Sequence, residues 1–126
     1  MRPVNVEAAL VAHLRSVLSV QVGTRVPATR PDAFVVLSRA GGQTSNLVQS
    51  QPRVLIECWG ATDGAAWDLV RDTWAAVADT DGRDLTKGVW VAHVELTEPV
   101  NYPDDATKSP RYQFIATLTV NLEETP

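Results

Sequence analysis

The final segment of the chain, Arg111–Leu122, alternates apolar and polar side chains with a period of two. Its even positions are all apolar or aromatic, whereas its odd positions are polar apart from Ile115. This alternation predicts a β-strand with one face toward a core and the other toward a wetter surface. At a rise of about 3.3 Å per residue, the strand would span roughly 40 Å, which is long for so small a domain. We expect such a strand to expose an edge unless a neighbouring subunit covers it.

Two other segments show the periodicity of helices. Residues 5–20 place apolar side chains three and four positions apart, directly after Asn5, a residue type that caps helix N-termini. A second helix is expected to begin at Thr62 or Asp63 and to carry apolar residues at helical spacing as far as Val77.

Further strands are predicted where β-branched and aromatic residues are concentrated. Ala33–Ala40, Arg53–Trp59 and Val89–Leu96 have this composition, and Gln21–Val26 is compatible with a short strand. The first two are close in the sequence, so they are expected to pair as an antiparallel hairpin. The amide-rich segment Gln43–Gln51 would then form its long polar tip.

Turn-forming residues mark 79–84, and prolines bound 99–110, so both segments are expected to be loops. The resulting order of elements predicts an α+β fold: an antiparallel sheet of four to five strands with two helices packed on one face. A length of 126 residues fits one domain over 1–126.

Composition narrows the class of protein. Hydrophobic residues make up 44% of the chain, which can support a core without disulfide bonds. Cys58 is the single cysteine, and its place in an apolar run suggests a small buried side chain in a reducing compartment. Polar residues interrupt the N-terminal apolar segment, so neither a signal peptide nor a membrane-spanning helix is expected.

Charge is distributed unevenly around the net value of −4. Residues 1–53 hold six basic and two acidic residues, a balance of +4, whereas residues 54–126 hold five basic and 13 acidic residues, a balance of −8. Such asymmetry occurs with nucleic-acid-binding arms and with acidic tails. It is also compatible with a subunit whose unlike faces meet head to tail in a ring.

The sequence holds no convincing metal site. Asp79, Asp81 and Asp84 resemble part of a calcium-binding loop, but the twelfth position, which requires glutamate, is Trp90. The two histidines, His13 and His93, fall on different elements, and with Cys58 they make a poor zinc set. His93 is expected to share a strand face with Val91 and Glu95. No metal or other cofactor is therefore predicted.

Neither catalysis nor nucleic-acid recognition has a recognisable motif. No serine lies in a nucleophile-elbow context, and Gly41-Gly42 lacks the Lys of a phosphate-binding loop. We therefore do not expect an enzyme. Arg25, Arg30, Arg39 and Arg53 could contact phosphates, which keeps a small nucleic-acid-binding module open as an alternative.

The four tryptophans are the largest apolar side chains available for a core or an interface. Packing of a helix on the sheet would account for most of them, and a protein–protein interface is the alternative for at least one. They are Trp59, Trp67, Trp74 and Trp90.

Several segments together carry a resemblance to a known family. They are the N-terminal helix, the Trp-bearing helix, Pro31–Gly42, Arg53–Gly60, Pro99–Asp104 and Pro110–Phe114. From Val6 to Glu123, the chain resembles the tail terminator (tail completion) proteins of long-tailed bacteriophages, particularly those of actinobacterial hosts. Neighbouring neck proteins of the same virions, such as head–tail connector components, are similar in size and build and remain the alternative.

The resemblance implies a structural role. Family members form a hexameric ring that caps the tail tube, stops its polymerisation and provides the surface to which the filled head docks. The implied partners are further copies of the chain, the major tail tube protein and neck or head-completion proteins, with genomic DNA passing through the lumen without sequence-specific recognition. The implied location is the tail–neck junction of the virion, after assembly in the host cytoplasm.

A subunit interface is expected around the polar hairpin tip, at its base and near the start of the closing strand. The odd-numbered face of that strand is a further candidate surface for a neighbour or for the lumen. The expected interface residues are Arg39, Gln43, Asn46, Leu47, Val48, Gln49, Arg53, Asp104, Asp105 and Arg111.

Overall fold

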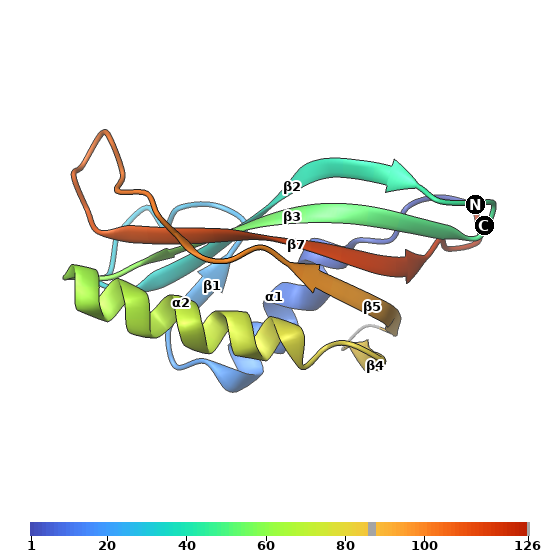
Figure 1. Cartoon of the computed structure of the whole chain (residues 1–126), viewed down its shortest axis with the longest axis horizontal. Coiled ribbons are helices and arrows are strands. Elements are labelled where there is room, and N and C mark those ends of the chain that lie inside the picture. The colour runs from blue at the N-terminus through green and yellow to red at the C-terminus, as the bar shows by residue number, and fades with distance from the viewer. Residues whose placement is uncertain (86–87, 126) are drawn as a thin grey trace.

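The computed structural model describes residues 1–85 and 88–125, and it confirms the α+β class. Helices α1 (Val6–Val17) and α2 (Asp63–Ala78) lie on the same side of one sheet (Figure 1). The seven strands run in the order β1-β2-β3-β7-β5-β4, with β6 also paired to β7. They are β1 (Gln21–Gly23), β2 (Phe34–Thr44), β3 (Gln49–Trp59), β4 (Arg83–Leu85), β5 (Val89–Leu96), β6 (Val100–Asn101) and β7 (Arg111–Asn121).

Both helices begin at side-chain caps that the sequence contains. The Asn5 side chain accepts a hydrogen bond from the Ala8 backbone N–H at 3.1 Å, and Thr62 does the same for Ala65 at 3.1 Å. Thr62 is therefore the N-cap of α2. Helix α1 is shorter than the expected 5–20, because Leu18 is already in an extended conformation that leads the chain into β1.

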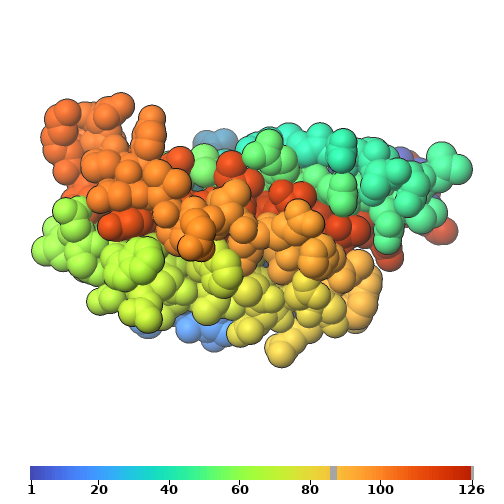
Figure 2. Space-filling view, in the orientation of Figure 1, coloured from blue at the N-terminus to red at the C-terminus, as the bar shows by residue number. Residues whose placement is uncertain are grey.

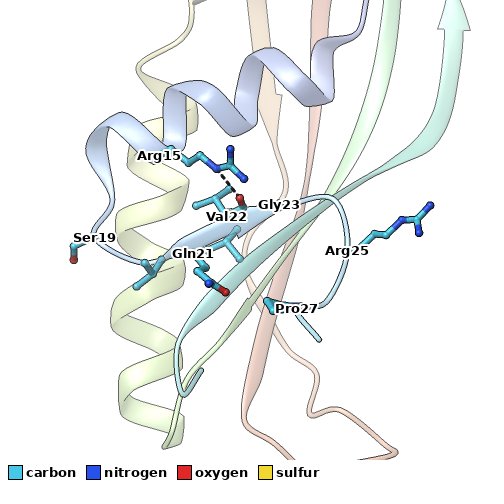
Figure 3. A pocket seen from close by; sticks show the side chains of 9 residues that line it. Arg15, Ser19, Gln21, Val22, Gly23, Arg25 and Pro27 are labelled. Atoms are coloured by element: carbon cyan, nitrogen blue, oxygen red, sulfur yellow. Dashed lines mark hydrogen bonds between the residues drawn. The ribbon is translucent and has the colours of Figure 1, made fainter. Parts of the chain in front are cut away.

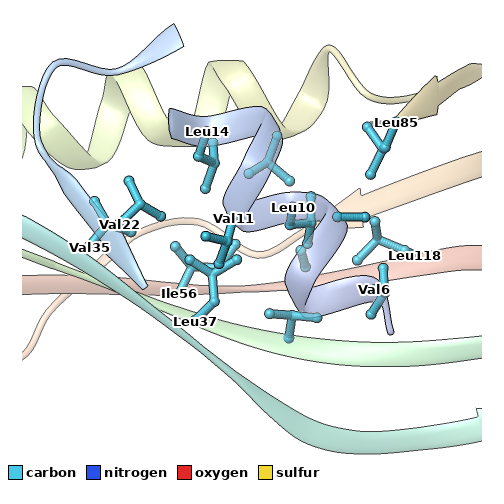
Figure 4. Close-up of a cluster of buried hydrophobic side chains, with 14 of the residues drawn as sticks. Val6, Leu10, Val11, Leu14, Val22, Val35, Leu37, Ile56, Leu85 and Leu118 are labelled. Carbon is cyan, nitrogen blue, oxygen red and sulfur yellow. The ribbon is translucent and has the colours of Figure 1, made fainter. Parts of the chain in front are cut away.

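The core lies between the helices and the even-numbered face of β7. Phe114, Ala116, Leu118 and Val120 are all buried there, as the alternation of the closing segment predicts. Figure 4 shows side chains from α1 packed over residues from several strands. The labelled members of this core are Val6, Leu10, Val11, Leu14, Val22, Val35, Leu37, Ile56, Leu85 and Leu118.

Strand β7 is central in the sheet, so the expectation that it exposes an edge is wrong. It pairs antiparallel with β3 from Asn121 to Arg111 on one side, and with β5 and β6 on the other. Strands of the same chain therefore supply the backbone hydrogen bonds of β7 on both sides, and no second subunit is needed to cover it.

The antiparallel hairpin of β2 and β3 is confirmed, but it is longer than expected. Gln43 pairs with Gln51 and Thr44 with Ser50, so most of the expected polar loop is strand and only residues 45–48 form the tip. Its strands pass a bulge between Arg39 and Gly42 and continue beyond the helices, toward the end of the molecule that holds both termini (Figure 1).

The sheet contains three pairings that the sequence did not reveal. Strand β1 is parallel to β2, which makes the sheet mixed rather than purely antiparallel. The short strands β4 and β6 lie within the segments 79–84 and 99–110 that were expected to be loops, β4 extending one residue further. These additions raise the strand count above the expected four to five. Each is only two or three residues long, too short to produce a recognisable period.

Candidate functional site

Among the described residues, no helix covers the face of the sheet opposite α1 and α2 (Figure 1). In β7 this face presents Gln113, Ile115, Thr117 and Thr119, all of which are half-buried. Pairing places Glu57 beside Gln113, and Arg53 beside Thr117. This helix-free face is therefore mixed in polarity, as the odd positions of the closing segment predict.

The two arginines expected at the base of the hairpin tip leave the sheet on opposite faces. Arg39 pairs with the buried Val54, and its guanidinium contacts Glu7 Oε1 at 2.9 Å on the helix-bearing side. It also donates to the Val4 carbonyl at 2.8 Å. Arg53 is exposed and belongs to the helix-free face, where it forms no ion pair with the described residues. Arg39 therefore ties the hairpin to α1, and Arg53 is the one available to a partner.

The hairpin tip is an ordered turn that displays apolar side chains. The Asn46 carboxamide oxygen accepts hydrogen bonds from the backbone N–H groups of Val48 at 2.9 Å and Gln49 at 3.0 Å. An Asn side chain in this arrangement fixes a turn. Leu47 is nevertheless 88% exposed and Val48 51% exposed, so the turn holds both residues toward solvent.

At the other end of the hairpin, a small aromatic cluster lies on the helix-free face. Trp59 stacks on Phe34 with ring centroids 4.5 Å apart, and both are buried together with Val36. The Trp59 indole donates a hydrogen bond to Asp104 Oδ2 at 3.3 Å. The Arg30 guanidinium lies 3.6 Å from the same oxygen and 5.4 Å from the Phe34 ring centre. These contacts hold the loop that follows β6 against the end of the sheet.

Arg111 and Glu57 complete this cluster. Arg111 Nη1 lies 3.2 Å from Glu57 Oε2, and the guanidinium also lies over the rings of Trp59 and Tyr102. Partial burial raises the pKa of Glu57, although the charge of Arg111 acts to lower it. Partial burial acts to raise the pKa of Asp104 as well. For Asp104, however, the opposing effects are stronger and the pKa is lowered. They are hydrogen bonds from the Ala106 backbone, the Trp59 indole and the Thr107 backbone, together with the charge of Arg111.

The ten expected interface residues therefore separate into two groups. Those of the hairpin tip and its base lie toward one end of the long axis, and those of the loop after β6 lie at the other (Figures 1 and 2). Asp104 and Arg111 already have partners within the chain, whereas Asp105 is exposed. Gln43 and Gln49 pair across the tip with other amides, from Gln51 and Asn46 respectively.

An apolar groove beside α2 was not predicted from the sequence. Trp67, Trp74 and Pro99 line it, with Arg71 and Glu98 at its borders, and it encloses about 170 Å³. The tryptophans are seven residues apart, which places them on one side of the helix two turns apart. That spacing was the available signal. However, it predicts core residues just as well as groove residues.

The tryptophans divide between core and surface more evenly than expected. Trp59 is buried, but in the small cluster on the helix-free face rather than under a helix. Trp74 packs against the main core, and its indole donates to the Thr97 carbonyl at 3.0 Å. Trp67 is 42% exposed, and Trp90 is exposed to the same degree.

A further hollow lies at the β1 edge of the sheet and has a volume of about 600 Å³ (Figure 3). Arg15 crosses it and donates a hydrogen bond to the Val22 carbonyl at 2.9 Å, while Arg25 points away toward solvent (Figure 3). The hollow is a shallow basic surface and brings no acid–base pair together.

Cys58 and His93 lie in different parts of the fold, the first buried and the second exposed. Across residues 1–85 and 88–125, no three His, Cys, Asp or Glu side chains gather as a metal site would require. Burial raises the pKa of Cys58 to about 12, so its thiol stays protonated. His93 lies 2.9 Å from Asp81 and shares the helix-free face with Glu95. Of these strand residues Val91 faces the core, because the register shifts between Val91 and His93. The expectation that His93 and Val91 share a face is therefore wrong.

Neither described helix has both the length and the apolar character needed to cross a bilayer. No protein-family model matches the chain, and no curated protein matches its sequence. Among solved structures, a chain described as "Virion of native gene transfer agent (GTA) particle" is similar, with a TM-score of 0.66 at 16% sequence identity. The match covers 91% of this chain and 93% of that chain, so the two share a fold over nearly their whole lengths.

Proposed function

We propose that this protein is a structural component of a virion, and more specifically a ring subunit that caps a tail tube. In this role it ends tube polymerisation and presents the surface to which the head docks. The observation that carries the proposal is the likeness, over nine-tenths of both chains, to a component of a gene transfer agent virion. The sequence resemblance to tail terminator proteins supports the finer assignment.

The surface of the molecule is consistent with assembly rather than with catalysis. Leu47 and Val48 project from an ordered turn, and Trp67 and Trp90 are exposed. Adjacent large apolar side chains held in solvent, as Leu47 and Val48 are, are typical of surfaces that become covered by a partner. We propose that the expected interface residues at the hairpin, from Gln43 to Gln49 with Arg53, contact a neighbouring copy. Asp105 contributes from the opposite end.

The proposed ring is homo-hexameric and lies at the tail–neck junction after assembly in the host cytoplasm. Its partners are the major tail tube protein below it and neck or head-completion proteins above it. Genomic DNA passes through the lumen and is not recognised by sequence. The chain acts without a catalytic site or cofactor in this role.

A second candidate is another neck protein of the same kind of virion, such as a head–tail connector component. The similarity to a virion chain supports it equally, because the description of that particle does not say which component the chain is. A nucleic-acid-binding module is less well supported, because Arg30 and Arg39 are engaged by Asp104 and Glu7 within the chain.

Deleting the gene from the particle that encodes it tests these assignments. Without a cap, tube subunits continue to add, so electron micrographs are expected to show overlong tails of variable length without heads. Loss of a different neck protein would leave tails of normal length beside unattached filled heads. Supplying the wild-type gene in trans is expected to restore tail length. If the deletion strain still produced particles with tails of normal length joined to heads, both the tail-cap role and the neck-protein role would be rejected.

A further inference from the structure

We propose that the hairpin tip of one copy, through Leu47 and Val48, docks into the Trp67–Trp74–Pro99 groove of the next copy. This inference builds on the proposed ring and identifies which two surfaces of the subunit meet. Its occupant is a second copy of the same chain.

The tip has the properties of a preformed ligand. The Asn46 side chain fixes the turn through the backbone N–H groups of Val48 and Gln49, and Gln43 Nε2 donates to Gln51 Oε1 at 3.3 Å across the hairpin. Leu47 is the most exposed large hydrophobic residue among those described. Because the turn is already ordered, little conformational entropy is lost when its side chains are covered.

The groove has the size and lining to receive one aliphatic side chain. Its enclosed volume is about 170 Å³, and its walls are mainly the indole rings and the proline. Trp67 packs against Tyr112 with ring centroids 5.4 Å apart, and Trp74 is fixed by its hydrogen bond to the Thr97 carbonyl. Both walls are thus held by the body of the domain, and Trp67 still leaves 42% of its surface uncovered.

The tip and the groove cannot meet within one chain. Gln49, beside the tip, pairs with Asn121 at one end of β7, whereas Val100, beside the groove, pairs with Gln113 near the other end. Figure 1 shows the tip end of the hairpin, near both termini, and the N-terminal half of α2 at opposite ends of the long axis. A contact between them joins two copies through unlike surfaces, which generates a closed ring or a filament rather than a two-fold dimer.

Charge favours the same pairing. From Ala33 to Ile56, the hairpin carries no acidic residue and two arginines, of which Arg39 is paired with Glu7 and Arg53 is free of any ion pair with the described residues. Helix α2 carries Asp63, Asp68 and Asp72 against Arg71, and Glu98 adds a further carboxylate at the groove. Opposite charges on the two surfaces steer them together and disfavour the contact of one tip with another tip.

A tip of two side chains buries much less than the roughly 1,000 Å² that a stable specific interface needs. One tip–groove contact is therefore weak alone. In a closed ring every copy supplies one tip and one groove, so the contacts cooperate.

Cysteine crosslinking tests the contact directly. One chain carries Ser45→Cys, which keeps Leu47 and Val48 on the tip, and another carries Glu98→Cys. Both positions are exposed, and a short bis-maleimide is added to the mixture. Cys58 is buried and does not react in the native state, so each chain has one reactive thiol. The expected result is a crosslinked pair containing one chain of each variant. A chain with both substitutions is expected to give a ladder of multimers. Replacing Glu98→Cys by Arg25→Cys, at the β1 edge, is the matched control and should abolish the mixed product.

Other outcomes overturn the contact. A Ser45→Cys homodimer as the main product would indicate tip-to-tip association. Absence of the mixed product at millimolar protein concentration would exclude docking of the tip in the groove. The proposed function is judged separately by tail length. If a ring assembles but this crosslink does not form, the proposed function as a tail cap stands and the tip–groove contact is rejected. If the crosslink forms strongly but deletion of the gene leaves tail length normal, the tip–groove contact stands and the proposed function as a tail cap is rejected.

Discussion

The indole of Trp59 donates a hydrogen bond to the carboxylate of Asp104 across 45 residues of sequence. The same carboxylate accepts backbone hydrogen bonds from Ala106 at 3.0 Å and Thr107 at 3.4 Å. One side chain therefore shapes the turn that follows β6 and anchors this turn to the end of β3. This carboxylate therefore adds to the backbone hydrogen bonds that already hold the loop, such as that from Tyr102 N–H to the Arg111 carbonyl.

Replacing Asp104 with alanine is expected to destabilise the protein by about 1–3 kcal/mol, because the partly buried Trp59 indole N–H loses its acceptor together with two backbone N–H groups. Urea unfolding monitored by tryptophan fluorescence measures the change. Asp105→Ala is the matched control, since Asp105 is exposed and its side chain has no hydrogen bond to a described residue. Equal losses in both variants would contradict a specific role for Asp104.

Glu57 is expected to produce an opposite dependence of stability on pH to that of an ordinary salt-bridged acid. Its pKa is raised in the folded state, so the folded protein binds the proton more tightly than the unfolded chain. The free energy of unfolding therefore increases as pH falls through the raised folded pKa toward the unfolded value near 4.5. Relative to Glu57→Gln, the wild type should gain stability between neutral pH and that value. Urea titrations at several pH values measure this, with Glu124→Gln as an exposed control, and a falling difference would contradict it.

The fold class could be predicted from the sequence because, in each long helix or strand, the spacing of the apolar residues places them on the face that is buried. The closing segment is the clearest case: Phe114 and Leu118 are buried, and Gln113 and Thr117 face away from the helices. The hairpin was misread at Gly41-Gly42, where two glycines and a run of amides suggested a loop. The strands continue there without a helix over them, so neither face needs to be apolar and the alternation disappears.

The candidate site was harder to predict, for a different physical reason. Leu47 and Val48 could be identified, since apolar residues within a polar segment stand out locally. The groove and the Trp59–Asp104 pair depend on contacts between elements distant in the sequence. Nothing in the spacing of Trp67 and Trp74 distinguishes a core from a surface groove, because both require apolar residues on one side of a helix.

Gly42 is expected to tolerate substitution far less well than Gly41. Gly42 has φ +119°, and a Cβ there would lie 2.2 Å from the Gln51 carbonyl oxygen, so Gly42→Ala should force the bulge to rearrange. Gly41 has φ +81° but open space around it, so Gly41→Ala should cost only about 1 kcal/mol of backbone strain. Chemical denaturation of the two variants measures the difference, and Gly42→Ala should lose at least twice as much. Equal losses would show that φ alone decides the cost.

Ser50 is expected to be a site where removing a polar atom does not weaken the fold. Its hydroxyl is buried and has no hydrogen-bond partner among the described residues. Ser50→Ala should therefore leave the free energy of unfolding unchanged or raise it by up to about 1 kcal/mol. Thr73 is the comparison, because its buried hydroxyl donates to the Leu69 carbonyl at 2.7 Å. Thr73→Val should lose about 1 kcal/mol. A clear loss in Ser50→Ala would indicate a partner for its hydroxyl.

Leu47→Asp is expected to weaken self-association without changing the stability of the single chain. The side chain is 88% exposed in the monomer, so its removal leaves no cavity in the fold. If Leu47 becomes buried in the neighbouring groove, losing that burial should lower the association constant at least about tenfold. Light scattering over a range of concentrations measures the association, and urea unfolding measures the monomer. Ser45→Asp places the same charge on the same tip but keeps Leu47, so it should associate almost as well as the wild type. Equal weakening by both variants would assign the effect to charge, and normal association of Leu47→Asp would show that Leu47 lies outside the contact.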